Sequence, residues 1–113
     1  MDDVTIDFDG ETLASPWLPA ATGAPAVLIF PTVMGVGDLE RGFAGKLNVL
    51  GYAAMIADLF GTQTRGALRD VMFGEMGRLK GDRGALLRRL RALLDAMLAQ
   101  AGVDPARVAV IGY

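Results

Sequence analysis

Three short apolar runs alternate with two segments of helical periodicity, and this order constrains the fold more than any other feature. The runs are Ala26–Phe30, Tyr52–Ala57 and Arg107–Ile111, and the helical segments between them cover 38–50 and 82–101. Uninterrupted apolar runs of this length are typical of parallel strands buried on both faces. Because strands separated by helices form crossover units, the sequence predicts an α/β fold with a mainly parallel sheet.

The helical segments carry their own start and stop signals. We expect Asp38 to cap the first helix and Gly51 to end it, and Asp82 and Gly102 to do the same for the second. The two apolar stripes consist of Phe43, Leu47 and Leu50 in the first helix and of Leu86, Leu90, Leu93, Leu94, Met97 and Ala101 in the second. These stripes predict helices that each bury one face against the sheet.

An antiparallel hairpin is predicted ahead of the parallel strands. Val4–Phe8 alternates with the period of a strand, Asp9-Gly10 is a strong hairpin turn, and residues 11–18 form the returning strand. Pro16 and Pro19 suit an edge of the sheet or the end of this strand. Residues 61–80 mix Gly, Thr, Arg and Met, and we expect a loop and a short helix there.

Composition excludes several functional classes. The 113 residues are 52% hydrophobic and carry a net charge of −2, which suits one folded domain and does not indicate a nucleic-acid partner. Met1 is followed by Asp2 and Asp3 rather than by a signal segment, and the longest apolar run, 24–31, is too short to span a bilayer. We therefore expect a soluble, cytoplasmic protein with no membrane partner.

The sequence contains no His and no Cys. Transition-metal sites depend on those side chains, so we expect no metal site, and no other cofactor is indicated. A Ser-His or Cys-His catalytic pair cannot exist within these residues. Ser15, which is the only serine, precedes Pro16, and we expect a turn at this Ser-Pro pair. Any nucleophilic chemistry must therefore be completed by other residues.

Four segments together resemble the dienelactone hydrolase family of the α/β-hydrolase superfamily. They are Ala26–Gly35, Leu50–Ala54, Ala57–Gly61 and Val103–Tyr113. The resemblance covers nearly the whole chain and implies a three-layer α/β-hydrolase-type sandwich, of which residues 1–113 form the N-terminal part of a single domain. It also implies that the strand at Ala26 lies between the strands at Tyr52 and Arg107.

The resemblance further implies a hydrolase that cleaves an ester or lactone. In the family, Gly-Tyr leads into the nucleophile elbow, a sharp turn from strand to helix that is flanked by small residues, and Gly112 fits the position before it. The Cys or Ser nucleophile and its Asp and His partners would all lie beyond Tyr113. The expected partners are therefore a small-molecule substrate and the missing C-terminal half of the domain.

Two positions in the loop after Ala26–Phe30 are candidate site residues by the same resemblance. Val33 maps to the backbone N–H donor of the oxyanion hole, which binds the negative oxygen that develops during acyl transfer. Thr32 maps to a position that is often a Glu in contact with the resting nucleophile. Thr cannot act as that carboxylate, so the substrate need not be a dienelactone.

The remaining candidates have structural interpretations. We expect Asp58 to bond loop amides, Arg65, Arg69 and Arg78 to be solvated, and Met72 and Met76 to fill gaps in the apolar packing. The alternatives are a carboxylate-binding role for the arginines and a substrate entrance lined by the methionines. Lys80, Arg83, Arg88, Arg89 and Arg91 are expected on the wet face of an amphipathic helix rather than on an anion-binding surface.

The sequence leaves two other functional classes open. Gly35-Val36-Gly37, with Asp58 at the end of the next strand, is a partial dinucleotide-binding fingerprint. Its glycines lag the strand, and Glu40 occupies the third glycine position, where its carboxylate would face a pyrophosphate. The third possibility is a non-catalytic α/β module that stands alone.

The last apolar strand has no helix after it to cover its faces, which is the expected sign of a truncated domain. One explanation is that a chemically modified cysteine follows Tyr113, since a nucleophilic Cys is readily oxidised. If the gene instead ends at Tyr113, we expect poor solubility, because the last strand would expose apolar side chains.

Overall fold

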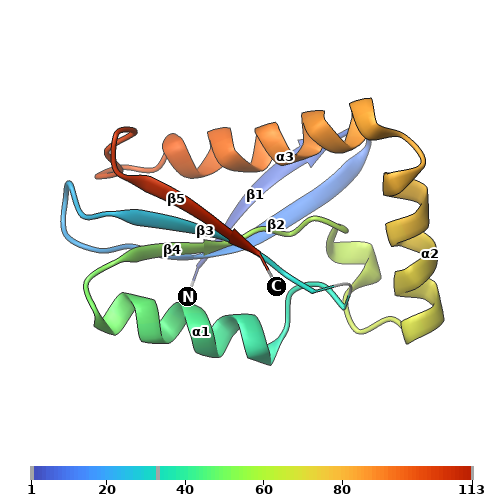
Figure 1. Ribbon diagram of the computed structural model, residues 1–113, viewed down its shortest axis with the longest axis horizontal. Coiled ribbons are helices and arrows are strands. Elements are labelled where there is room, and N and C mark those ends of the chain that lie inside the picture. Colours follow the sequence, from blue (N-terminus) through green and yellow to red (C-terminus); the bar gives the residue numbers. More distant parts are fainter. Residues whose placement is uncertain (1, 33, 113) are drawn as a thin grey trace.

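The computed structural model describes residues 2–32 and 34–112, and within them the strands form one mixed sheet (Figure 1). The strands are β1 (Asp2–Phe8), β2 (Glu11–Leu18), β3 (Ala26–Phe30), β4 (Ala53–Ile56) and β5 (Val108–Gly112). The helices are α1 (Asp38–Val49), the 3-10 helix η1 (Thr62–Thr64), α2 (Arg69–Lys80) and α3 (Arg83–Leu98).

The strand order across the sheet is β1-β2-β4-β3-β5. β3 is parallel to both of its neighbours, so Ala26 pairs with Ala53 on one side and with Val108 on the other. This confirms the predicted placement of the strand at Ala26. β2 runs antiparallel to β4 and pairs with it only at Trp17 and Leu18, so the β1–β2 hairpin extends beyond the parallel part of the sheet.

Helices cover both faces of the parallel strands, which confirms the three-layer arrangement (Figure 1). The alternation of side chains along β3 explains the layers. Val27 and Ile29 belong to the apolar cluster that includes Ala44 of α1. Ala26 and Leu28 belong to the cluster that includes residues of α2 and α3. A strand buried on both faces must be apolar at every position, as this one is.

The hairpin turn follows its sequence signal. Asp9 and Gly10 both have positive φ, at 49° and 79°, as a two-residue turn between twisted strands requires. The register pairs Phe8 with Glu11. The predicted hairpin is therefore confirmed, and it places Glu11 at the start of β2, a position that matters for the charged network described below.

The structure corrects the expected N-cap and apolar stripe of α1 and the expected C-terminal end of α3. Gly37 rather than Asp38 is the N-cap of α1, since Asp38 already has helical geometry. Leu50 lies past the last helical residue and is 73% exposed, so it does not extend the stripe that packs on the sheet. Asp82 caps α3 as predicted, by accepting a hydrogen bond from the Ala85 amide at 3.0 Å. α3 ends at Leu98, which leaves Ala101 outside the helix and exposed.

Candidate active site

The loop of residues 31–37 joins the central strand β3 to α1 and contains both candidate site residues. Val33 lies outside the described residues. Thr32 accepts two hydrogen bonds within the loop: the Gly35 amide donates to the Thr32 carbonyl at 2.9 Å, and the Met34 amide donates to the Thr32 hydroxyl at 3.3 Å. The Thr32 hydroxyl is therefore used in a hydrogen bond within the loop.

Gly35 fixes the position of this loop against the core. Its φ of 77° is one that side chains rarely adopt, and it is buried. A Cβ atom at this residue would meet side-chain atoms of Phe60 and Met72, each at 3.5 Å. Met72 is 2% exposed, which confirms its predicted role as an apolar contact, and it connects the loop to α2.

Glu40 also holds the loop, a role that was not predicted from the sequence. Its side chain is 3% exposed, and its Oε1 accepts a hydrogen bond from the Gly37 amide at 3.1 Å. The signal was present in the sequence as an acidic residue three positions after the helix cap. The contact also weakens the dinucleotide interpretation, because the helix N-terminal amide that would face a pyrophosphate is already bonded to a carboxylate.

The register of the sheet brings three chain segments to one edge. Phe30 at the end of β3 pairs with Gly112 at the end of β5, and Ile29 pairs with Ile56 at the end of β4. The end of β3, from which loop 31–37 starts, therefore lies between the ends of β4 and β5. In open α/β sheets, ligands bind at this carboxyl edge of the strands.

Asp58 follows β4 and ties the hairpin to this edge. Its carboxylate accepts hydrogen bonds from the amides of Ala14 at 2.9 Å and Gly61 at 3.2 Å, and its own amide donates to the Ser15 hydroxyl at 3.0 Å. The predicted structural role of Asp58 is confirmed. Ser15 lies within β2 rather than in the expected turn, because the strand continues through Pro16. It is buried in this network and is not a free nucleophile.

Arg65 completes the Asp58 network, contrary to the prediction that it is solvated. Its guanidinium lies 3.2 Å from the Asp58 carboxylate and also donates to the Ala14 carbonyl. The side chain is 28% exposed. Burial raises the pKa of Asp58, and the Ala14 amide, the Arg65 charge and the Gly61 amide oppose that rise without cancelling it.

Asp58→Asn is expected to lower the free energy of unfolding by about 1–3 kcal/mol. The NH₂ group of Asn takes the place of one carboxylate oxygen, so the buried amide that donated to that oxygen loses its acceptor. Urea unfolding followed by tryptophan fluorescence measures the change. Asp70→Asn, at an exposed carboxylate, is the matched control and should fall within about 0.5 kcal/mol of the wild type. Equal effects at the two positions would contradict a structural role for Asp58.

Arg89 is buried, although it was predicted to lie on the solvent-exposed face of its helix. It is 3% exposed, and it donates to the Leu59 carbonyl and to the Glu11 carboxylate, both at 2.8 Å. Its guanidinium carbon lies 5.4 Å from the centre of the Phe8 ring. Arg83, Arg88 and Arg91 are exposed as predicted.

Arg78 approaches the same carboxylate from α2. It lies 3.1 Å from Glu11 and 2.8 Å from Glu75, and its side chain is 48% exposed. Arg69 is exposed and stacks over Phe73 at 5.7 Å. Neither arginine indicates a carboxylate-binding site, because Arg78 is already paired with Glu11 and Glu75 and Arg69 lies at the surface.

The Glu11 network predicts a pH dependence of stability. Burial alone would raise the pKa of Glu11, but the hydrogen bond and charge of Arg89, with the charge of Arg78, lower it below its ordinary value of 4.5. A carboxylate whose pKa is lower in the folded than in the unfolded state stabilises the fold at pH values above its unfolded-state pKa. This contribution is lost as the pH falls through the lowered pKa of the folded state. Glu11 therefore favours folding at neutral pH and not in acid.

The expected result is that Glu11→Gln lowers the free energy of unfolding at about pH 7 and that the difference from wild type shrinks toward about pH 3. Urea titrations across this range measure it. Asp58 is common to both proteins, so its own titration cancels in the difference. A difference that stays constant across the range would show that the Glu11 charge does not contribute.

Neither a metal cluster nor a membrane span is found among residues 2–32 and 34–112. No group of three or more acidic, His or Cys side chains that could hold a metal gathers there, and no helix is long and apolar enough to cross a bilayer.

The candidate site consists of loop 31–37 at the carboxyl edge of the sheet. Glu40 holds this loop through the Gly37 amide, and the Asp58 network follows the end of β4 at the same edge.

A central parallel strand between two parallel neighbours, helices on both faces and a loop at the carboxyl edge define an α/β-hydrolase-type fold. The dienelactone hydrolase family model matches residues 13–113, so the chain belongs to that family. No curated protein matches.

Solved structures agree with this assignment. The protein named m3DLH is 33% identical with a TM-score of 0.85, over 96% of this chain and 46% of its own. A dienelactone hydrolase-like promiscuous phosphotriesterase, P91, from metagenomic libraries is 28% identical with a TM-score of 0.86, over 98% and 47%. A dienelactone hydrolase candidate from Klebsiella pneumoniae, at 19% identity and a TM-score of 0.73, shares the fold over 98% and 48%. The chain thus spans about half the length of these structures.

Proposed function

We propose that residues 1–113 are the N-terminal part of a single α/β-hydrolase domain, and that the parent protein is a cytoplasmic enzyme that cleaves a carboxylic ester or lactone. The observation that carries this proposal is the pairing of Phe30 with Gly112, which brings the end of β5 beside the end of β3, from which loop 31–37 starts. A nucleophile elbow that starts there would face the loop across the edge of the sheet.

In this mechanism the second half supplies a Cys or Ser nucleophile with its His and Asp partners. The nucleophile attacks the substrate carbonyl, and the negative charge that forms on the carbonyl oxygen is held by two backbone N–H donors. We propose Val33 as one donor and the residue after the nucleophile as the other. Collapse of the tetrahedral intermediate breaks the ester C–O bond and expels the alcohol, which takes a proton from the His partner, and an acyl-enzyme remains. Water activated by the same His then hydrolyses the acyl-enzyme, which releases the acid and restores the nucleophile.

Thr32 is the position at which this site departs from the family pattern. Its hydroxyl accepts a hydrogen bond from the Met34 amide, so it stabilises the backbone at Met34. A neutral side chain here leaves the nucleophile without the carboxylate contact found in many relatives. We therefore propose activation by the His partner alone and a substrate other than a dienelactone.

The test is an intact mass and peptide map of the purified protein, followed by hydrolysis assays. p-Nitrophenyl acetate and a simple lactone are assayed first, and a phosphotriester is included because the 28% identical relative is a promiscuous phosphotriesterase. We expect Cys or Ser after Tyr113 and ester turnover that is abolished by a thiol- or serine-directed reagent. The chain of 113 residues assayed alone should be inactive, since it has no His and no Cys.

Turnover by the chain of 113 residues alone would overturn the proposed triad. A parent protein with the elbow but with no activity on esters, lactones or phosphotriesters would overturn the substrate class. Retention of a dinucleotide by the purified protein would favour the cofactor-binding alternative instead.

A further inference from the structure

Helix α2 contacts the candidate loop through the side chain of Met72. A Cβ atom built at Gly35 would lie 3.5 Å from Met72 Cε and 3.5 Å from Phe60 Cδ2, so both side chains lie next to the Gly35 backbone. Phe60 is 1% exposed and Met72 is 2% exposed. Figure 1 shows α2 standing across the end of the sheet at which the chain leaves β3 and β4. Two buried side chains from separate segments therefore form a seat for Gly35.

Gly35 depends on this seat because it has no side chain of its own to insert into the core. It is buried and has a φ of 77°, a conformation that other residues rarely adopt. Its amide donates to the Thr32 carbonyl within the loop. Val33, which we propose as the oxyanion donor, lies between these two residues in the sequence. The segment that carries the donor is thus placed against the core by side chains from other elements.

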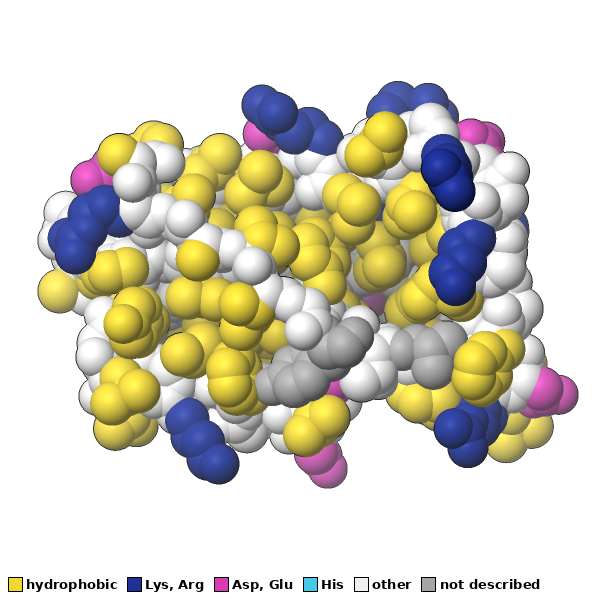
Figure 2. All heavy atoms as spheres, in the orientation of Figure 1, with side chains coloured by type: hydrophobic (Ala, Val, Ile, Leu, Met, Phe, Trp, Pro, Cys, Tyr) yellow, Lys and Arg dark blue, Asp and Glu magenta, His cyan; other side chains and the backbone are white. Residues whose placement is uncertain are grey.

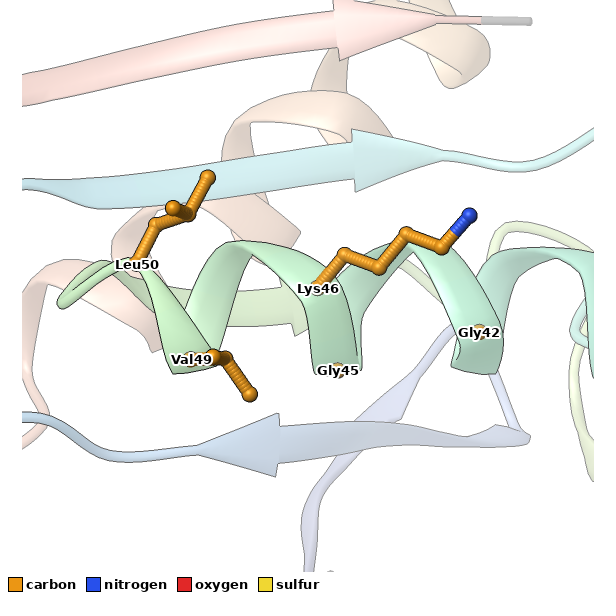
Figure 3. A pocket seen from close by; sticks show the side chains of 5 residues that line it. All are labelled: Gly42, Gly45, Lys46, Val49 and Leu50. Atoms are coloured by element: carbon orange, nitrogen blue, oxygen red, sulfur yellow. The ribbon is translucent and has the colours of Figure 1, made fainter.

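Helix α1 holds the end of the loop rather than its middle. The Glu40 carboxylate accepts the hydrogen bond from the Gly37 amide at 3.1 Å. Farther along α1 the surface forms a shallow hollow of 590 Å³ (Figure 3). The residues that line this hollow are Gly42, Gly45, Lys46, Val49 and Leu50. Glu40 therefore fixes the point at which the loop enters α1, whereas Phe60 and Met72 support Gly35.

The Phe60 half of the seat belongs to a turn that is braced by hydrogen bonds. The Phe60 carbonyl accepts hydrogen bonds from the Gln63 side chain at 3.3 Å and from the Thr64 hydroxyl at 3.4 Å. The next residue, Gly61, donates its amide to the Asp58 carboxylate at 3.2 Å. Phe60 is therefore placed by the segment that follows β4 and does not depend on α2.

The Met72 half of the seat depends on the packing of α2, which has few buried side chains. The buried residues of α2 are Met72 and Leu79, whereas Val71 and Phe73 on either side of Met72 are exposed. Figure 2 shows hydrophobic side chains gathered over β5 and the adjoining part of α3. A groove of 270 Å³ there has Leu28, Leu90 and Val110 in its lining, and none of its described lining residues comes from α2. Met72 is therefore a main apolar link between α2 and the rest of the described chain.

We propose that Met72 is a positioning residue of the hydrolase, which packs on Gly35 and thereby sets the place of the oxyanion donor at Val33. The inference rests on the proposed function, because the position of the loop affects turnover only if the loop carries the donor. A displacement of about 1 Å caused by a change far from the chemistry can lower a rate about 10²-fold. Met72 acts in this way on kcat without touching the substrate.

The test replaces Met72 by alanine in the full-length protein, with Met97→Ala as the matched control. Met97 is fully buried in the same apolar cluster, near the C-terminal end of α3 and at the opposite end of the molecule from α2 (Figure 1). Both variants should lose melting temperature, because both empty a buried methionine site. For p-nitrophenyl acetate, kcat should fall about tenfold in Met72→Ala and stay within about twofold in Met97→Ala, with KM nearly unchanged in both.

Two further variants separate positioning from a general loss of structure. Met72→Leu conserves the apolar volume and should restore kcat to within about threefold of the wild type. In a protein that already carries Val33→Pro, Met72→Ala should cause no further fall in kcat, because the donor that it positions is missing. A merely structural role would lower kcat by the same factor in both backgrounds.

Hydrogen exchange measured by mass spectrometry tests the contact apart from turnover. Peptides covering residues 31–37 should exchange faster in Met72→Ala than in the wild type or in Met97→Ala, because the loop has lost part of its seat. Val49→Ala, at the 88% exposed residue of the α1 hollow, is the surface control and should match the wild type. If Met72→Ala does not fold, Met72→Val and Met97→Val replace the pair with the same expected differences.

Equal losses of kcat in the Met72 and Met97 variants, or equal exchange of residues 31–37 in the two, would overturn the inference. A Met72→Ala effect that adds fully to that of Val33→Pro would overturn it as well. A wild-type protein without ester turnover would overturn the proposed function, and faster exchange of the loop in Met72→Ala would then still support the placement of the loop by Met72.

Discussion

Replacing Arg89 by methionine is expected to lower the free energy of unfolding by about 3 kcal/mol. Methionine retains much of the apolar volume but removes the guanidinium. The Leu59 carbonyl then has no donor, and the Glu11 carboxylate loses the closest cation. The estimate lies at the low end for breaking a buried pair because the Glu11 side chain is 24% exposed and keeps Arg78 as a partner.

Urea unfolding of the variant beside Arg91→Met measures this effect. Arg91 lies two residues away on the same helix, is 73% exposed, and pairs with Asp95 at 3.1 Å, so its loss should change stability by less than about 1 kcal/mol. The comparison holds helix propensity and charge constant while burial differs. Similar losses for the two variants would show that Arg89 acts only as a surface charge.

Replacing Val33 by proline is expected to lower kcat of the full-length hydrolase by about 10²–10³-fold, the effect of losing one oxyanion donor. Proline has no backbone N–H, so the proposed donor is removed while the loop keeps an apolar side chain. KM should change far less than kcat, because the lost interaction strengthens only as negative charge develops on the carbonyl oxygen.

Val33→Ala is the matched control for that experiment, since it keeps the N–H and removes only methyl groups. Its kcat should stay within about tenfold of the wild type. Circular dichroism and the melting temperature of Val33→Pro establish that the loop substitution leaves the fold intact. A folded proline variant with wild-type kcat would mean that Val33 supplies no oxyanion donor.

The layers of the fold could be predicted from the sequence because they depend on local periodicity. Each apolar run became a strand, and Asp82 caps its helix as the pattern indicated. The N-terminus of α1 was placed one residue late, because Gly37 has no side chain to act as a cap. The amide of Gly37 is instead satisfied by Glu40, three residues further on.

The buried charges could not be predicted in the same way. Arg89 and Glu11 are 78 residues apart in sequence, and Arg65 and Ala14 are 51 apart. Nothing in the helical pattern of α3 distinguishes Arg89 from its exposed neighbours until the hairpin is folded over it. For the candidate site, the position of loop 31–37 followed from the strand pattern, whereas its contacts with Phe60, Met72 and Glu40 required the tertiary structure.

The short contact between β2 and β4 has a consequence for how the molecule responds to stress. Among the described residues, the hairpin joins the parallel strands through Trp17 and Leu18 in the sheet, and Arg89, Arg78, Asp58 and Arg65 form further polar contacts with it. The same hairpin belongs to the main apolar core through Leu13 and Trp17, and Val4, Ile6 and Phe8 pack against that core. The hairpin is therefore held on the parallel strands by side-chain packing and buried charge more than by sheet hydrogen bonds, so its local opening should be as costly as exposing part of the core.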